Sequence, residues 1–115
     1  MAVSFGRVIP KQLKFVPYNG KIADITHADT AHHYLDLETA LSETRKIVFL
    51  SLQVPRIAGT GNILAYPNEG ARQCQVSGDY ETTVGIAAGS QRLEYSLTVA
   101  NDDFDLYCLG YVVEA

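Results

Sequence analysis

Alternating hydrophobic and polar positions dominate the second half of the chain. Over residues 92–99, one set of alternate positions is mostly apolar and the other is polar: Leu93, Tyr95, Leu97 and Val99 against Arg92, Glu94, Ser96 and Thr98. A period of two predicts a half-buried antiparallel strand with the first set in the core and the second facing solvent. The polar run 101–103 predicts a turn, and the apolar stretch 104–113 predicts the returning strand of a hairpin.

The most hydrophobic segment is 47–54, which is rich in β-branched residues and ends at Pro55. It predicts a central strand, because Pro55 and Gly59 would end a helix there after about two turns. The core-facing positions are then Val48, Leu50, Leu52 and Val54. We expect residues 55–61 to form a flexible loop, because two glycines lie within it.

Shorter strands are expected over 32–37, 62–66, 73–76 and 81–87, with one helical turn over 38–43 that is too short to be stable alone. Pro10, Pro17 and Asn19-Gly20 interrupt the first thirty residues, which predicts an extended arm or one edge hairpin. The expected fold class is all-β: a single antiparallel β-sandwich, jelly-roll-like, with about eight short strands and at most one helical turn. The arm would occupy 1–30 and the sandwich 31–115.

Charge argues against two classes of partner. The 115 residues carry a formal net charge of −4, and of the nine basic residues only Arg45 and Lys46 are adjacent. A nucleic-acid binder usually has a basic stripe that neutralises phosphates, so neither nucleic acid nor an anionic membrane is an expected partner. We see no signal peptide and no apolar stretch long enough to span a bilayer, so we expect synthesis in a reducing cytoplasm.

The groups capable of chemistry do not form a recognisable catalytic pattern. His27, His32 and His33 lie near Asp29 and Asp36, but neighbouring strand residues point to opposite faces, so no closed metal site is expected. Asp102, Asp103 and Asp105 fit a turn better than a calcium loop. Ser51, Ser96 and Cys108 lack a flanking nucleophile motif. We therefore expect no enzyme activity, no catalytic or metal-ligating residue and no cofactor. Whether Cys74 and Cys108 pair stays open.

Tyrosines offer one alternative function, because flat amphipathic rings can stack on sugar rings. The alternative is core and cross-strand packing. It suits Tyr95 in the core stripe, and it suits Tyr107 and Tyr111, which are expected to share a face of the last strand with Leu109. The candidate glycan contacts are Tyr66, Tyr80 and Tyr107.

Five segments in a fixed order carry a resemblance. They read Tyr34-Leu35-Asp36-Leu37, then Lys46 to Leu52, then Ile63 to Pro67, then Arg92 to Ser96, and finally Phe104 to Tyr111. This order resembles a β-sandwich module of tailed-bacteriophage structural proteins (tail-associated, fibre or capsid decoration proteins), whose closing strand has a similar Gly-Tyr pair, here Gly110-Tyr111. The resemblance covers about residues 34–113 and consists of packing residues, so it transfers no binding residue.

The resemblance implies a non-enzymatic virion structural protein, made in a host cytoplasm and located in the virion. We expect a capsid decoration, vertex or tail-associated protein that binds capsid or tail proteins and forms a small homo-oligomer, with a trimer favoured. The expected contacts lie in the N-terminal arm, at Phe5, Val8, Leu13, Phe15 and Tyr18. Two alternatives stay open: a carbohydrate-binding module that recognises a receptor or glycan, and a small-molecule or metal-dependent enzyme using His32, His33 or Asp102 to Asp105.

Overall fold

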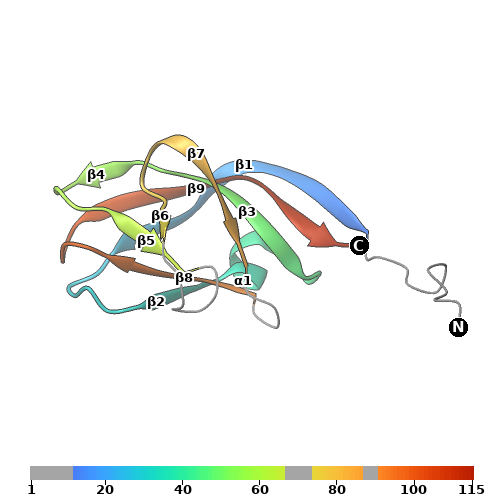
Figure 1. Cartoon of the computed structure of the whole chain (residues 1–115), viewed down its shortest axis with the longest axis horizontal. Helices are drawn as coiled ribbons and strands as arrows, with labels where there is room; N and C mark the ends of the chain where they lie inside the picture. The colour runs from blue at the N-terminus through green and yellow to red at the C-terminus, as the bar shows by residue number, and fades with distance from the viewer. Residues whose placement is uncertain (1–11, 67–73, 87–90) are drawn as a thin grey trace, which may run out of the picture.

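The computed structural model describes residues 12–66, 74–86 and 91–115. Within them, nine strands and one short helix form two antiparallel sheets (Figure 1). The predicted all-β sandwich is confirmed. The jelly-roll order of strands stays a prediction. No helix in the described residues is long and apolar enough to cross a membrane.

The larger sheet has β9 (Asp103–Glu114) at its centre. β1 (Leu13–Thr26) pairs with one side of β9, and β3 (Ile47–Val54) pairs with the other, followed by β7 (Gly78–Gly85) in the order β1-β9-β3-β7. Beyond Pro55, the short strand β4 (Arg56–Ala58) pairs with β9 as well. The expectation of a loop over 55–61 is therefore wrong in part, because the Pro55 carbonyl accepts the Asp105 N–H at 3.1 Å and keeps the chain beside β9.

The smaller sheet has the order β2-β8-β5-β6. Its strands are β2 (His33–Asp36), β8 (Arg92–Leu97), β5 (Ile63–Ala65) and β6 (Cys74–Gln75). The expected helical turn is α1 (Leu37–Leu41), which begins where the Asp36 carboxylate accepts the N–H groups of Glu38 and Thr39. It ends at Ser42, whose left-handed backbone (φ 51°) turns the chain toward β3.

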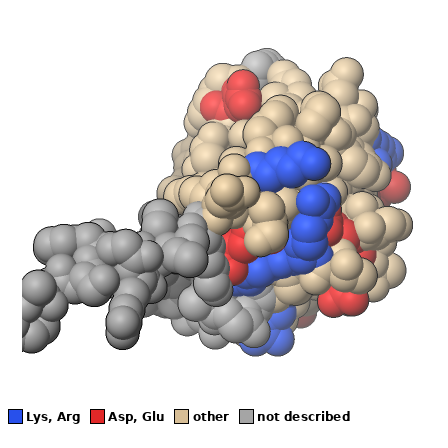
Figure 2. All heavy atoms as spheres, turned by 90° about the vertical axis from the view of Figure 1, so that its right-hand side faces the viewer, with Lys and Arg blue, Asp and Glu red and all other residues tan. Residues whose placement is uncertain are grey.

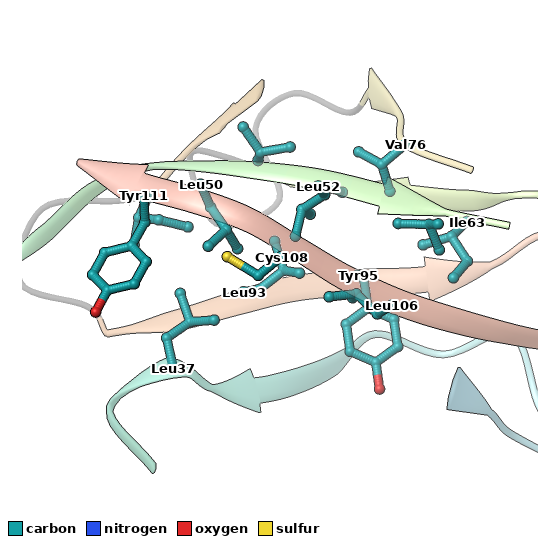
Figure 3. Close-up of a cluster of buried hydrophobic side chains, with 14 of the residues drawn as sticks. Leu37, Leu50, Leu52, Ile63, Val76, Leu93, Tyr95, Leu106, Cys108 and Tyr111 are labelled. Carbon is teal, nitrogen blue, oxygen red and sulfur yellow. The ribbon is translucent and has the colours of Figure 1, made fainter. Parts of the chain in front are cut away.

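The core lies between the two sheets (Figure 3). Leu50 and Leu52 of β3, and Leu106 and Cys108 of β9, pack against side chains of β8 and α1 such as Leu93, Tyr95 and Leu37. The predicted core stripe of β8 is confirmed for Leu93, Tyr95 and Leu97. It fails at Val99, which is 41% exposed because β8 ends at Leu97.

Irregular pairing between β3 and β9 moves two residues from their expected faces. Ile47 pairs with Val113 and Phe49 with Val112, so Val48 lies at a bulge and Ile47 takes the buried position expected for Val48. A second register shift, between Ser51 and Leu52, lies opposite Gly110 and Cys108. Tyr111 consequently faces the core, so it does not share a face with Tyr107 as the alternation suggested.

β1 is an edge strand of the larger sheet, although its sequence lies within the expected arm. It pairs with β9 from Leu13 opposite Glu114 to Thr26 opposite Asp103, with two register shifts between Pro17 and Ala23. Ile25 of β1 is buried in the core. Residues 1–11, the remainder of the expected arm, lie outside the described residues.

Candidate binding surfaces

An apolar row crosses the outer face of the larger sheet. Val112 of β9 pairs with Phe15 of β1 on one side and with Phe49 of β3 on the other. Directly paired residues point to the same face of a sheet, and Tyr111, next to Val112, points to the core, so the row faces outward. Phe15 is 57% exposed and Phe49 42%. We call these three residues the aromatic row.

Gly110 provides the surface on which the Phe15 ring lies. A Cβ atom at Gly110 would stand 2.3 Å from Cζ of Phe15 and 3.0 Å from the backbone oxygen of Val16. Only a residue without a side chain allows the ring to approach the backbone of β9 this closely. The Gly110-Tyr111 pair therefore has two distinct roles, since Gly110 accommodates an exposed ring and Tyr111 fills the core.

The assembly contacts expected from the sequence lie partly on this face. Leu13, Phe15 and Tyr18 all belong to β1 and are all exposed. Phe5 and Val8 lie outside the described residues. Phe49 and Val112 were not singled out by the sequence analysis, because an exposed apolar position within a hydrophobic strand looks like any other strand residue.

The three tyrosines considered as glycan contacts lie in different environments. Tyr66 is buried, its hydroxyl is 2.7 Å from the Ser96 hydroxyl, and its ring stacks on His32. Tyr107 is half-buried on β9, paired with Lys21 and Gln53. Tyr80 of β7 is 55% exposed and lines a pocket. The sequence gives no sign of this separation, because the three residues lie on segments whose arrangement is set by tertiary packing.

The pocket beside Tyr80 has a volume of about 230 Å³. Its described lining is polar apart from one glycine: Arg56, Asn62, Gln75, Ser77, Gly78 and Tyr80. Four segments meet here, since Arg56 belongs to β4, Asn62 precedes β5, Gln75 ends β6, and Gly78 and Tyr80 begin β7. Of these residues only Tyr80 was expected from the sequence to contact a ligand, because the other side chains come together only through the pairing of β5 with β6 and of β3 with β7.

Glu94 and Ser96 are buried, so the prediction that they face solvent is wrong. They lie on the outer face of β8, but Tyr66 covers Ser96 and His32 binds the Glu94 carboxylate through Nδ1 and Oε2. Glu94 is 6% exposed, and its Oε1 has no hydrogen-bond partner among the described residues. Beside it, the Arg92 guanidinium lies 4.0 Å from the centre of the Tyr34 ring, a cation–π contact.

The other two histidines stack on each other between β1 and β2. The ring centroids of His27 and His33 are 3.5 Å apart, and the rings are almost parallel. His27 Nε2 lies 2.7 Å from the Tyr95 hydroxyl, and His33 Nε2 lies 2.8 Å from Oδ1 of Asp29. Burial, reinforced by the neighbouring His33, lowers the pKa of His27. His32 and His33 thus bind different carboxylates on different faces.

The described residues contain no group of three His, Cys, Asp or Glu side chains placed to hold a metal ion. Asp102 is buried and accepts the Gly61 N–H at 2.5 Å through Oδ2, so its carboxylate fixes a loop. Cys74 and Cys108 are both free thiols. Burial raises the pKa of Cys108 to about 11, which leaves its thiol protonated and unreactive near neutral pH.

Charges of both signs mix on the end of the molecule seen in Figure 2, where Lys and Arg side chains lie beside Asp and Glu. Glu43 and Arg45 form a bidentate ion pair, with Nε–Oε2 and Nη2–Oε1 distances of 3.0 and 2.8 Å. The Tyr111 hydroxyl also donates to Oε1 of Glu43. Together these bonds lower the pKa of Glu43 to about 2.

Comparisons with protein-family models, with curated proteins and with solved structures find no match for this chain. The resemblance to bacteriophage modules therefore rests on the strand sequences alone.

Proposed function

We propose that this chain is a non-enzymatic structural protein of a virion, a capsid decoration, vertex or tail-associated protein that assembles as a small homo-oligomer. The aromatic row carries the assembly part of the proposal, because two exposed phenylalanines and a valine form a continuous apolar strip on the outer face of the sheet. The resemblance of the strand sequences supports the virion part. A closed trimer is the favoured assembly state.

The geometry of the row suits a second copy of the same chain. Phe15 and Phe49 lie on opposite sides of Val112 on one face, so Phe15 of one subunit can pack against Phe49 of another. Two aromatic rings in contact prefer an offset or edge-to-face arrangement, which the exposed rings of Phe15 and Phe49 can adopt. Removing these rings from water supplies the driving force for association.

Association through the sheet face is favoured over pairing at the β1 edge. The edge carries Pro17, which has no N–H to donate, and two register shifts between Pro17 and Ala23. Both features are typical of edge strands that resist the addition of another strand. A contact through the face needs no further backbone pairing, so neither feature of the edge opposes it.

Light scattering behind size exclusion tests the assembly part on the full chain at about 100 µM, a concentration at which a micromolar contact is populated. We expect a discrete closed oligomer for the wild type and a monomer for the double variant Phe15→Ser/Phe49→Ser. The matched control is Ile57→Ser, which removes a 55% exposed isoleucine on β4 and should leave the oligomer intact. A monomeric wild type would overturn the assembly proposal.

Mass spectrometry of purified virus particles tests the virion part separately. We expect this chain among the stoichiometric particle proteins. Its absence from particles, with an intact oligomer in solution, would reject the virion location and retain the assembly surface.

A further inference from the structure

The pocket beside Tyr80 has features of a built binding site. Ser77 is 3% exposed, and its hydroxyl donates to the Asn62 side-chain oxygen at 3.1 Å while accepting the Ile63 N–H at 3.1 Å. Arg56 Nη1 donates to the Gly61 carbonyl at 2.8 Å, and the Gln75 amide donates to the Ser77 carbonyl at 3.4 Å. These bonds hold four of the lining side chains at one end, those of Arg56, Asn62, Gln75 and Ser77, and so orient them before any ligand arrives.

The same bonds leave other polar atoms for a ligand. Within the described part of the chain, the remaining N–H groups of Arg56, the Asn62 amide nitrogen, the Gln75 amide oxygen and the Tyr80 hydroxyl have no protein partner. The guanidinium N–H groups are charged donors and the Asn62 amide nitrogen is a neutral donor. The Gln75 amide oxygen is an acceptor, and the Tyr80 hydroxyl can donate or accept a hydrogen bond. Such a mixed set suits a ligand with several hydroxyl groups.

Tyr80 forms an aromatic wall whose position depends on Gly78. A Cβ atom at Gly78 would stand 2.5 Å from Cε1 of Tyr80, and Gly78 has a φ of +146°, which L-residues rarely adopt. The ring therefore lies against the bare backbone of β7 while 55% of the residue is exposed. A flat, half-exposed phenol can stack on the apolar face of a sugar ring.

Size and charge narrow the class of ligand. A volume of about 230 Å³ is below the roughly 300–1,000 Å³ of sites for drug-sized molecules, so the pocket suits one ring. Arg56 is the single charged residue in the described lining. Its planar guanidinium matches a carboxylate in two parallel hydrogen bonds, which favours a ligand that carries an acidic group.

We propose that this pocket binds one acidic saccharide unit, a sugar ring bearing a carboxylate, with its ring on Tyr80 and its carboxylate on Arg56. The amides of Asn62 and Gln75 bind the hydroxyl groups. The site does not depend on the assembly proposed above, because it uses none of the residues of the aromatic row. It would give the protein an affinity for acidic glycans.

Titration of the ¹⁵N-labelled full chain, followed by NMR, tests the site with methyl glucuronide, methyl N-acetylneuraminide, methyl glucoside and sodium acetate as probes. We expect millimolar affinity for at least one acidic sugar, with shifts confined to the lining residues and saturating by about 50 mM. Arg56→Lys keeps the charge but loses the paired geometry, and should weaken binding about ten-fold. Tyr80→Ala should weaken it to a similar degree.

Tyr34→Ala is the matched control, because Tyr34 is also about half exposed but belongs to β2 and does not line the pocket. The affinity of this variant for the acidic sugar should equal that of the wild type. Equal shifts with glucoside would reject the acidic specificity, and equal shifts with acetate would reduce the site to an anion site. Absence of lining shifts with both acidic sugars would overturn the proposal. The amide spectrum of each variant reports whether that variant is folded. If Tyr80→Ala does not fold, Arg56→Lys alone tests the site.

Discussion

The imidazole ring of His27 lies 3.5 Å from that of His33 and is inclined to it by only 5°. The pair lies between the last residue of β1 and the first residues of β2, where the chain crosses from one sheet to the other. Burial and the neighbouring His33 ring both disfavour a positive charge on His27 and lower its pKa. Asp29, bonded to His33, and the Tyr95 hydroxyl, bonded to His27, are the ionisable groups that face the pair.

The first prediction concerns stability in mild acid. Because the pKa of His27 is lowered in the folded state, the unfolded chain binds more protons below its ordinary value of 6.5. The contribution of neutral His27 is complete above pH 6.5 and is lost as the pH falls through its folded pKa. We expect a loss on the order of 1 kcal/mol or less between pH 7.5 and 5.5, since the rings are partly hydrated. Urea unfolding at each pH measures it.

His27→Gln should flatten this dependence, whereas His32→Gln, which removes the histidine bonded to Glu94, should leave it in place. An unchanged slope in His27→Gln would show that another group causes the loss.

The second prediction concerns strong acid and the buried carboxylate of Glu43. Arg45 and Tyr111 lower the pKa of Glu43 to about 2 from an ordinary 4.5. The unfolded chain therefore takes up a proton first, so the stabilisation is complete above pH 4.5 and is lost as the pH falls toward 2. Glu43→Gln should reduce the unfolding free energy at pH 7 by about 1–3 kcal/mol and weaken the dependence between pH 4.5 and 2. Glu38→Gln, on the exposed side of α1, is the control.

The third prediction concerns the contact between Phe15 and Gly110. Gly110→Ala should cost on the order of 1 kcal/mol, because its Cβ atom would displace the exposed Phe15 ring and approach the Val16 oxygen. In the background of Phe15→Ala the same substitution should cost less, since the ring is gone and only the 3.0 Å approach to the Val16 oxygen remains. A double-mutant cycle by chemical denaturation measures the coupling. Strictly additive effects would place the Phe15 ring elsewhere in solution.

The fourth prediction concerns Asp102. Its carboxylate accepts the N–H of the buried Gly61, and a Cβ atom at Gly59 would stand 2.0 Å from its Oδ1. Asp102→Ala should lower the unfolding free energy by about 1–3 kcal/mol, because the Gly61 N–H loses its partner. Asp103→Ala, one residue along the chain and only half-buried, should change it by less than about 0.5 kcal/mol. Equal effects would mean that the turn tolerates loss of the Asp102 bond. Thermal melts distinguish these outcomes.

The strands β3 and β8 were predictable because their signal is local. The alternation around Leu93, Tyr95 and Leu97 and the apolar run ending at Pro55 each define a strand without reference to the rest of the chain. The burial of Glu94 was not predictable, because His32, which binds it, lies 62 positions earlier. The burial of Ile47 in place of Val48 was not predictable either, because the position of a bulge depends on the partner strand as well as on the bulged strand.

The candidate sites were harder to predict than the strands. Phe15 was expected at a contact surface, but its alignment with Phe49 depends on both strands pairing with Val112. The pocket is formed by four segments, and only Tyr80 has a side chain whose type alone predicts a ligand contact. Polar residues such as Gln75 and Ser77 are common at strand ends, so nothing in their sequence separates a binding group from an ordinary surface residue.

The central position of β9 has a consequence for biosynthesis. β9 is the last strand in chain order, yet β1, β3 and β4 all pair with it. On the ribosome β1, β3 and β4 emerge before β9, the strand with which all three pair. Most contacts of the larger sheet therefore link distant parts of the sequence. Folding of this topology is therefore expected to be slow and to complete only after β9 has been made. Until β9 is made, the apolar strand β3 lacks its main partner, and nascent chains are then most exposed to aggregation and to cellular chaperones.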